Sequence, residues 1–352
     1  MTDGNDARSA GCPRLSVVIS CFNYRAFVAE AIESVLGQDV PGVELIVVDD
    51  GSTDGSWEVI RGYGIAKAAQ RPNGGALAAC RYGLEQAEAD FVLFLDADDR
   101  LAPGSLARIL PHLEAGVAKL QFPLIPIDAA GRVIGPASPP LAAGFAGARL
   151  RREVIATGCY ASPPTSGNVF RRDLCALLEE VDYERWVDGV MLFAAPFFGE
   201  VVSLPEPLGC YRLHERNGSQ SGAAPEAARF AREAERFRKR HAHLRRILAA
   251  RGVAELLVDA DETFFVRERR LFGRVLEGAR PGLGEVLALQ RLLVGDARPI
   301  RQRLALALLF SVLLAAPRDL RRALLAYRLT PGRRSAWGFA RATLRRLGLK
   351  PA

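Results

Sequence analysis

Clusters of carboxylates follow two apolar runs in the N-terminal half of the sequence. Two aspartates come directly after residues 43–48, and three more follow residues 91–95, so the set comprises Asp49, Asp50, Asp96, Asp98 and Asp99. Like charges gathered at one place repel, so they need a partner, most simply a divalent cation. Magnesium is usually held by one or two carboxylates together with substrate phosphates, and oxygen ligands also suit manganese. The pattern therefore predicts a site for Mg²⁺ or Mn²⁺ and a phosphate-bearing ligand.

The apolar runs themselves are expected to be strands that position these carboxylates. Residues 15–20, 43–48 and 91–95 are mostly apolar and rich in β-branched side chains, and they alternate with stretches of helical periodicity. Such alternation predicts right-handed crossovers and a mainly parallel sheet covered on both faces. Ligands of open α/β sheets bind at the carboxyl ends of the strands, where the five aspartates should converge on one rim. Residues 135–168, rich in Pro, Gly, Ala and Ser, are expected to be loop.

A structural role stays open for some of these aspartates. At strand ends, Asp49 and Asp54 are also suited to capping the following helix or forming Asx turns. Asp96 and Asp98 differ, because side chains two residues apart on an extended segment point the same way. That spacing favours joint contact with one metal ion or one metal–diphosphate unit.

Taken in order, the motifs resemble those of the family 2 glycosyltransferases. The series is SVVISCFNY at 16–24, AIESVLGQ at 31–38, ELIVVDDGSTD at 44–54, NGG at 73–75 and LDADD at 95–99. It covers roughly residues 14–115, and a less specific likeness extends to about residue 220. The resemblance implies a GT-A fold, which is an α/β Rossmann-like fold with a mainly parallel central sheet flanked by helices. It also implies inverting transfer of a sugar from a nucleoside diphosphate donor to an acceptor hydroxyl.

Carried over position by position, the resemblance implies a donor site. Ser20, Phe22 and Asp50 would line the nucleoside pocket, with Asp50 binding the base. Asp96 and Asp98 would form the DxD pair and contact the ribose and the metal–diphosphate, respectively. A metal that bridges the diphosphate would neutralise charge on the leaving group, which agrees with this assignment.

Two later segments extend the resemblance. Residues 165–172 are similar to the family's acceptor-side loop, which would bring three residues beside the acceptor: Thr165, Ser166 and Gly167. Residues 211–219 resemble the family's YRxHxxNxS ending, which makes His214 a metal ligand or diphosphate contact. A satisfied structural histidine is the alternative. Arg212 is expected either to pair with phosphate or to be solvated.

The resemblance also implies a general base. Residues 186–188 stand where the family has an acidic pair ahead of a helix, and Asp188 occupies the position of its second acid. A carboxylate there can take the acceptor's proton during attack on the anomeric carbon. The first acidic position holds Val187 instead, so the electrostatics around Asp188 depart from the family pattern. A helix N-terminal aspartate that interacts with the dipole is the alternative.

Basic charge is concentrated in the C-terminal part of the chain. Residues 1–211 hold 17 Lys and Arg against 27 Asp and Glu, whereas residues 212–352 hold 30 against 13. Helical segments at 319–328 and 337–346 interleave Arg with Leu, Tyr, Phe and Trp, which predicts contact with an anionic membrane surface. The alternative is a helical cap packed on the catalytic domain or on a second copy in a homo-oligomer. Nucleic acid is not expected, because no recognisable binding module accompanies the charge.

These patterns divide the chain into three parts. We expect a flexible polar tail at 1–13, a GT-A catalytic domain at 14–220 and a basic, mainly helical region at 221–352. Six scattered cysteines and the absence of a signal-peptide pattern indicate a cytoplasmic protein. The most apolar run, 304–316, is shorter than the roughly 20 residues that a spanning helix needs. The expected location is therefore the cytoplasm, with peripheral attachment to the inner face of the cell membrane as its extension.

The combined prediction is a metal-dependent glycosyltransferase that acts in cell-surface polysaccharide or glycolipid synthesis. Nucleotidyltransferases share the strand–helix arrangement but normally have a Gly-rich basic loop after the first strand. Residues 20–25 contain no glycine, which argues against that class. A catalytically silent nucleotide-sugar-binding or scaffold protein of the same fold stays open, and Val187 is the one feature that favours it.

Overall fold

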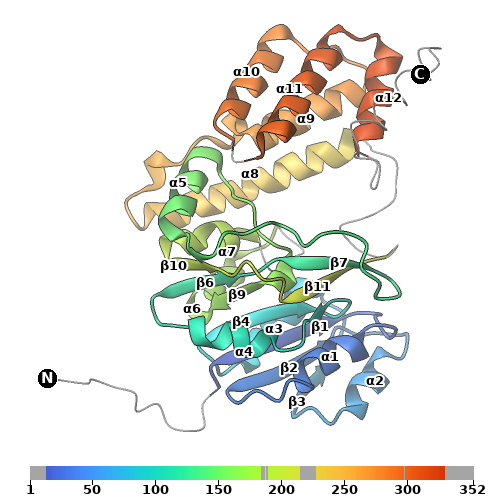
Figure 1. The fold of residues 1–352 in the computed structure, drawn as a ribbon, viewed down its shortest axis with the longest axis vertical. Helices are drawn as coiled ribbons and strands as arrows, with labels where there is room; N and C mark the ends of the chain where they lie inside the picture. The colour runs from blue at the N-terminus through green and yellow to red at the C-terminus, as the bar shows by residue number, and fades with distance from the viewer. Residues whose placement is uncertain (1–12, 184–186, 188, 215–226, 297, 330–352) are drawn as a thin grey trace, which may run out of the picture. The chain divides into compact units, whose positions relative to one another are not determined.

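The computed structural model describes residues 13–329 except 184–186, 188, 215–226 and 297 (Figure 1). The described residues form two compact units, one within 1–220 together with 243–256 and the other within 221–242 together with 257–352. Residues 243–256 therefore belong with the first unit, although the sequence places them in the C-terminal region.

The first unit is built on a mixed sheet of eight strands over its described residues, in the order β3-β2-β1-β4-β9-β6-β10-β8. The strands are β1 (Leu15–Cys21), β2 (Val43–Asp49), β3 (Lys67–Gln70), β4 (Phe91–Asp96), β6 (Val117–Gln121), β8 (Gly144–Phe145), β9 (Asn168–Arg171) and β10 (Glu200–Ser203). Strands β3, β2, β1 and β4 are mutually parallel, whereas β9 runs antiparallel between β4 and β6. The predicted α/β architecture with a mainly parallel central sheet is confirmed.

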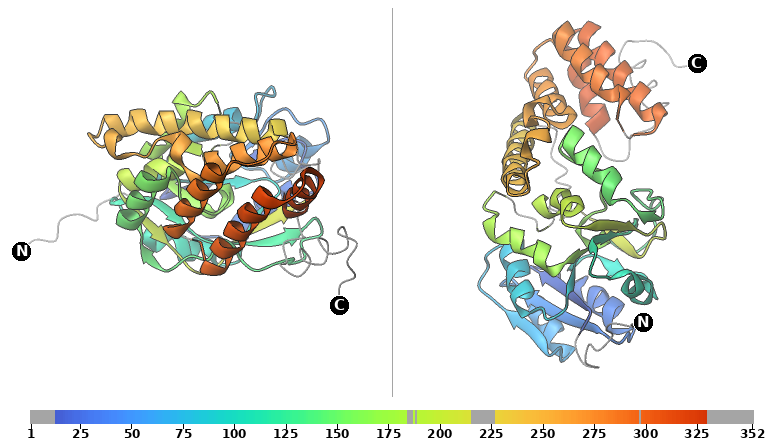
Figure 2. Two further views of the ribbon diagram at one scale, coloured as in Figure 1. Left: turned by 90° about the horizontal axis from the view of Figure 1, so that it is seen from above. Right: turned by 90° about the vertical axis from the view of Figure 1, so that its left-hand side faces the viewer.

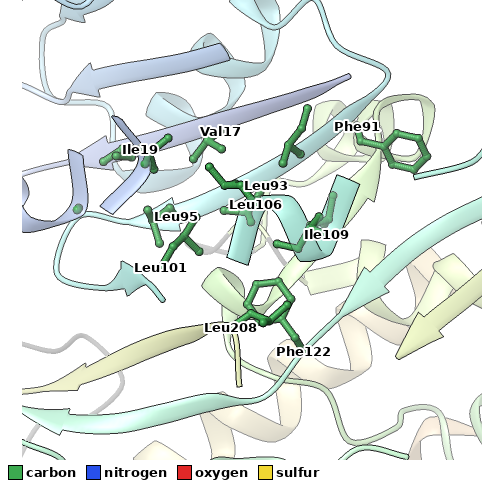
Figure 3. Close-up of a cluster of buried hydrophobic side chains, with 14 of the residues drawn as sticks. Val17, Ile19, Phe91, Leu93, Leu95, Leu101, Leu106, Ile109, Phe122 and Leu208 are labelled. Atoms are coloured by element: carbon green, nitrogen blue, oxygen red, sulfur yellow. The ribbon is translucent and has the colours of Figure 1, made fainter. Parts of the chain in front are cut away.

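Helices cover both faces of the parallel half, because β1 alternates its side chains between two apolar layers. Val17 and Ile19 belong to one core with helices α1 (Val28–Leu36), α2 (Ser56–Gly62) and α4 (Ser105–Ile109). Figure 3 shows this layer, in which Leu93 and Leu95 of β4 face Leu106 and Ile109 of α4. Val18 points the other way, toward α3 (Ala76–Gln86).

The approach of α3 to β1 depends on Gly83. A Cβ added there would lie 2.3 Å from Val18 Cγ1, in a buried contact between helix and strand. We expect Gly83→Ala to lower the free energy of unfolding by about 1–3 kcal/mol, because the helix must move away from the sheet. Denaturant melts of the purified protein measure the change.

Gly62, the last residue of α2, provides the matched control. A Cβ added at Gly62 meets no described atom within 4 Å. Gly62→Ala is therefore expected to leave stability unchanged or to raise it by less than about 1 kcal/mol, through helix propensity. Equal effects of the two substitutions would show that the contact between α3 and β1 is not tight.

A second sheet, with three strands over the described residues, joins segments of the first unit that are far apart in the sequence. It has the order β5-β11-β7, with strands β5 (Arg100–Leu101), β7 (Leu124–Asp128) and β11 (Gly209–Leu213). β11 pairs antiparallel with β5 and parallel with β7. The pairing brings the residues before β5 next to those after β11.

The remaining helices of the first unit include one that the sequence analysis missed. They are η1 (Leu110–His112), α5 (Gly147–Thr157), η2 (Thr165–Gly167), α6 (Arg172–Cys175), η3 (Ala176–Glu180), α7 (Gly189–Ala194), η4 (Ala195–Phe197) and η5 (Ala254–Leu256). The prediction of loop over 135–168 is wrong at α5, which buries only Leu150, Val154 and the small Gly147. Two large apolar residues spaced four apart are too few to indicate a helix from periodicity. Gly158, with φ +76°, marks the end of this helix.

The second unit is a helical assembly (Figure 2). Its elements are η6 (Ala260–Glu262), α9 (Phe264–Leu276), α10 (Leu283–Val294), α11 (Ile300–Ala315) and α12 (Arg318–Leu329), with the first part of α8 (Ala227–Ala249). Leu271, Leu289, Phe310 and Leu325 lie in one buried cluster from four of these helices. Over the described residues, no helix combines the length and apolar character needed to cross a membrane.

Candidate active site

The carboxyl ends of β2, β1 and β4 form one edge of the sheet. Ser20 of β1 pairs in register with Val48 on one side and with Asp96 on the other. Asp50 follows β2, and the exposed ring of Phe22 follows β1. The structure thus brings the residues predicted for the donor site to a common edge.

Asp50 fixes a loop at this edge. Its two carboxylate oxygens accept hydrogen bonds from the amides of Gly74 (2.9 Å) and Gly75 (2.7 Å). Gly51 has φ +77°, and a Cβ there would lie 2.9 Å from the amide nitrogen of Asn73. The turn after β2 and the loop at 73–75 therefore form one closely packed wall.

Two other aspartates confirm the structural interpretation given to them. Asp49 Oδ1 accepts hydrogen bonds from the amide of Ser52 at 2.9 Å and from Gln70 at 3.1 Å. Asp54 Oδ1 accepts from the amide of Ser56, the first residue of α2, at 3.0 Å. These carboxylates hold the local backbone.

Asp98 meets His214 although the two residues are 116 positions apart. His214 Nε2 lies 2.9 Å from Asp98 Oδ2, and both side chains are largely buried. The pairing of β5 with β11 positions them, since Asp98 precedes β5 and His214 follows β11. Two aromatic rings pack on the imidazole, with centroid distances of 5.7 Å for Tyr24 and 5.0 Å for Phe27.

Arg212 stabilises the backbone of Asp98, and its surroundings differ from both expectations for it. The side chain is fully buried, so it is not solvated. Its Nε donates to the carbonyl of Asp98 at 2.8 Å, and its guanidinium donates to Glu30 at 2.7 Å. The guanidinium also lies 4.8 Å from the centroid of the Phe27 ring. Arg212 thus anchors the backbone of Asp98 rather than pointing toward a ligand.

Asp99 is buried next to this pair. Burial and the neighbouring charge of Asp98 raise its pKa to about 8. Its carboxylate accepts hydrogen bonds from the hydroxyl of Ser166 (2.6 Å) and from the amide of Arg212 (2.8 Å). Asp49, Asp50 and Asp99 therefore each accept hydrogen bonds from groups within the protein, whereas a cation would be the partner of Asp96 and Asp98.

The three residues predicted on the acceptor side lie in η2. Thr165, Ser166 and Gly167 are all buried. Ser166 Oγ accepts a hydrogen bond from the amide of Asp96 at 3.1 Å while it donates to Asp99. In the structure, this segment braces the end of β4, and its acceptor-side role stays a prediction.

The described residues could hold a metal ion only if a bound ligand supplied further coordinating oxygen atoms. The part of the chain that the structure describes contains no group of three or more His, Cys, Asp or Glu side chains arranged to hold a metal ion. Asp98 and His214 converge, and half-buried Asp96 ends the neighbouring strand. One or two protein carboxylates completed by phosphate oxygens is the arrangement that magnesium usually adopts.

Asp188, the predicted base, lies outside the described residues. Helix α7, which follows it in the sequence, is connected to the central sheet through Tyr160 and the buried ammonium group of Lys119. Lys119 of β6 donates to Gln121 (2.8 Å), to the Tyr160 hydroxyl (3.0 Å) and to Ser162 (2.9 Å), and the Tyr160 hydroxyl donates to the Leu192 carbonyl in α7 at 2.7 Å.

Sequence reasoning missed several of these supporting residues. Lys119 had a detectable signal, because it is a single charge within the otherwise uncharged run at 117–121. Tyr24 lies in the quoted motif at 16–24, and Phe27 begins the periodic stretch after it, but neither pattern indicates a contact with His214. Glu30 had no signal, since its partner Arg212 is 182 positions away.

Comparison with known proteins identifies the class. A family model described as Glycosyl transferase family 2 matches residues 16–157. An uncharacterized glycosyltransferase of a Nostoc species is 30% identical over 295 residues, which cover 80% of this chain and 88% of that protein. The chain therefore belongs to the family 2 glycosyltransferases and is a glycosyltransferase enzyme.

Two further similarities bear on fold and context. The structure of TarS residues 1–349 from S. aureus, in complex with UDP-GlcNAc, superposes with a TM-score of 0.52 at 21% identity, covering 90% of this chain and 91% of that one. This likeness supports the GT-A fold. The GalNAc(5)-diNAcBac-PP-undecaprenol beta-1,3-glucosyltransferase of Campylobacter jejuni is 34% identical over 116 residues, 30% of this chain and 36% of that protein.

Proposed function

We propose that this enzyme transfers a sugar, with inversion, from a nucleoside diphosphate donor to an acceptor hydroxyl in a metal-dependent reaction. The observation that carries the proposal is the meeting of Asp98 with His214 at 2.9 Å, beside the strand end that bears Asp96. Family membership indicates sugar transfer as the reaction, and the contact between Asp98 and His214 indicates where in the chain the reaction would take place.

The edge of the sheet supplies the donor site in this proposal. Phe22 offers an exposed ring for stacking on the base, and the wall held by Asp50 bounds the nucleoside pocket. Ser20 lies at the end of β1, in register with Val48 and Asp96, and Asp96 would face the ribose. The remaining acceptor capacity of the Asp50 carboxylate is available to a base N–H, since each carboxylate has about four lone-pair sites.

Asp98, His214 and Asp96 are the residues that would hold Mg²⁺ or Mn²⁺ with the diphosphate. When bound, the cation neutralises the charge that develops on the leaving group. Arg212 keeps the Asp98 backbone in place, and Tyr24 and Phe27 fix the plane of the imidazole.

Asp188 is proposed to accept the proton of the acceptor hydroxyl. The acceptor oxygen forms a bond to the anomeric carbon while the bond from that carbon to the diphosphate oxygen breaks, and the diphosphate leaves with the electron pair. Attack on the face opposite the leaving group inverts the anomeric configuration. Thr165, Ser166 and Gly167 are proposed to support the acceptor side of this site.

A lipid-linked saccharide is the proposed acceptor, which places the enzyme in the synthesis of a cell-surface polysaccharide or glycolipid. One partial relative is named for a PP-undecaprenol substrate, and another, 31% identical over 119 residues, is a minor teichoic acid biosynthesis protein of Bacillus subtilis. Because such an acceptor is anchored in a membrane, the enzyme would have to act at the cytoplasmic face of that membrane.

A thermal-shift screen of nucleotide sugars, with and without MnCl₂, tests the donor proposal. A ligand present at about 100 times its Kd stabilises the native state by about 2.7 kcal/mol, which shifts the melting temperature by roughly 5–10 °C for a unit of this size. We expect one nucleoside diphosphate sugar to give such a shift only with manganese, and the free sugar to give none. Absence of a shift for every donor would contradict the proposal.

A further inference from the structure

Helix α11 is apolar on the face turned away from its own core. Leu306, Leu309, Phe310 and Leu313 are buried in the second unit. On the opposite side, Ile300, Leu304 and Leu308 are 57%, 63% and 63% exposed and lie four residues apart, hence in one line along the helix. A helix that is hydrophobic on all sides normally has every side covered.

Helix α10 continues this surface. Leu283, Leu287 and Val294 are 61%, 42% and 77% exposed, and their spacing of four and seven places them in one line. Gln290 marks the seam between the helices, since it donates to the Ala307 carbonyl at 3.1 Å and to Ser311 Oγ at 2.9 Å. The exposed side chains flank that seam on both helices, which pack side by side (Figure 1). We call these six residues the apolar face.

The charges around the apolar face are positive. Exposed Arg291 and Arg301 adjoin it on α10 and α11, and neither forms an ion pair with another described residue. The two acidic residues between positions 283 and 315 are both paired: Glu285 with Arg274 at 3.1 Å and Asp296 with Arg298 at 3.5 Å. The apolar face therefore has unneutralised arginines beside it and no free carboxylate.

Helix α12, which the sequence analysis expected at a membrane, has a different role in the structure. Its Leu324 and Leu325 are buried, and Leu325 belongs to the core of the second unit. Arg321 is buried as well and donates to the Ala316 carbonyl at 2.7 Å. Within the described residues, the apolar side of α12 packs inward, and the exposed apolar area lies on α10 and α11 instead.

We propose that the apolar face docks on an anionic lipid membrane, with its leucines at the boundary between headgroups and acyl chains and Arg291 and Arg301 among the headgroups. Apolar side chains beside exposed arginines are the combination that interfacial helices use. A second copy is a poorer partner, because it would bring the same arginines to the contact. Membrane docking does not depend on the proposed chemistry, and the proposed lipid-linked acceptor would give the enzyme a reason for it.

Vesicle flotation with the full chain tests this inference without donor or acceptor, so its outcome is independent of the proposed chemistry. Vesicles of phosphatidylglycerol and phosphatidylcholine in equal parts are compared with phosphatidylcholine alone. The wild-type protein should bind the anionic vesicles, and Leu304→Ser/Leu308→Ser should lower the partition coefficient about tenfold or more. Each of Arg291→Gln and Arg301→Gln should lower it about fivefold and weaken its dependence on salt.

The matched control is Leu256→Ser, which removes an exposed leucine of the first unit. It should leave binding unchanged, and circular dichroism should show all variants folded, because the replaced side chains are exposed. Three results would overturn the inference: no binding of the wild type to anionic vesicles, binding indifferent to Leu304→Ser/Leu308→Ser, or a dimer in sedimentation velocity that the same substitutions dissociate. Loss of binding only on deletion of residues 330–352 would assign the contact to that segment.

Discussion

Replacing Asp98 by Asn is expected to lower sugar transfer by about 10²–10³-fold and to remove the effect of manganese on donor binding. The substitution keeps the size of the side chain but removes the charge that would face a cation and the donor diphosphate. Calorimetry with the donor identified by thermal shift, with and without MnCl₂, measures the binding effect. Single-turnover assays measure transfer.

Asp39→Asn is the matched control for this variant. Asp39 is exposed on the segment that leads into β2, at the edge opposite the candidate site, and has φ 42°. Asn tolerates the left-handed region well, so the change removes one charge without backbone strain. Metal-dependent donor binding that persists in Asp98→Asn would refute the metal assignment, whereas an equal loss in both variants would point to a general effect of charge.

The parallel half of the sheet was predictable because its signals are local. Strands β1, β2 and β4 are runs of apolar residues, and α1 shows a clear periodic stripe at Val28, Ala31, Ile32 and Val35. Each run can be recognised without knowing its neighbours. The parallel direction of these strands then follows from the helical crossovers that connect them.

The other half of the sheet depends on long-range pairing. Strand β9 has four residues and inserts antiparallel between β4 and β6, more than 40 positions from either along the chain. Nothing within residues 168–171 indicates that position. The same holds for β5, whose two residues become a strand only through pairing with Gly209 and Cys210.

For the candidate site, sequence reasoning found the aspartates but not their environments. Asp50, Asp98 and Asp99 look alike as carboxylates after strands, yet one binds loop amides, one meets His214 and one is buried with a raised pKa. These differences come from partners such as Gly74 and Ser166 in other segments. Only the family resemblance connected His214 with the site in advance.

Replacing Asp188 by Asn is expected to leave donor affinity unchanged and to lower transfer by about 10²–10⁴-fold. Asn has nearly the same shape but cannot accept the proton of the acceptor hydroxyl. In the sequence it directly precedes Gly189, the first residue of α7, and Lys119 and Tyr160 connect that helix to the central sheet through the Leu192 carbonyl. Donor titration and transfer assays on the same preparation separate binding from chemistry.

Asp182→Asn serves as the control, because Asp182 is an exposed acid six positions earlier in the same connection. It should retain both donor binding and transfer. Near wild-type transfer by Asp188→Asn would place the base elsewhere, and loss of donor affinity would make Asp188 part of the donor site.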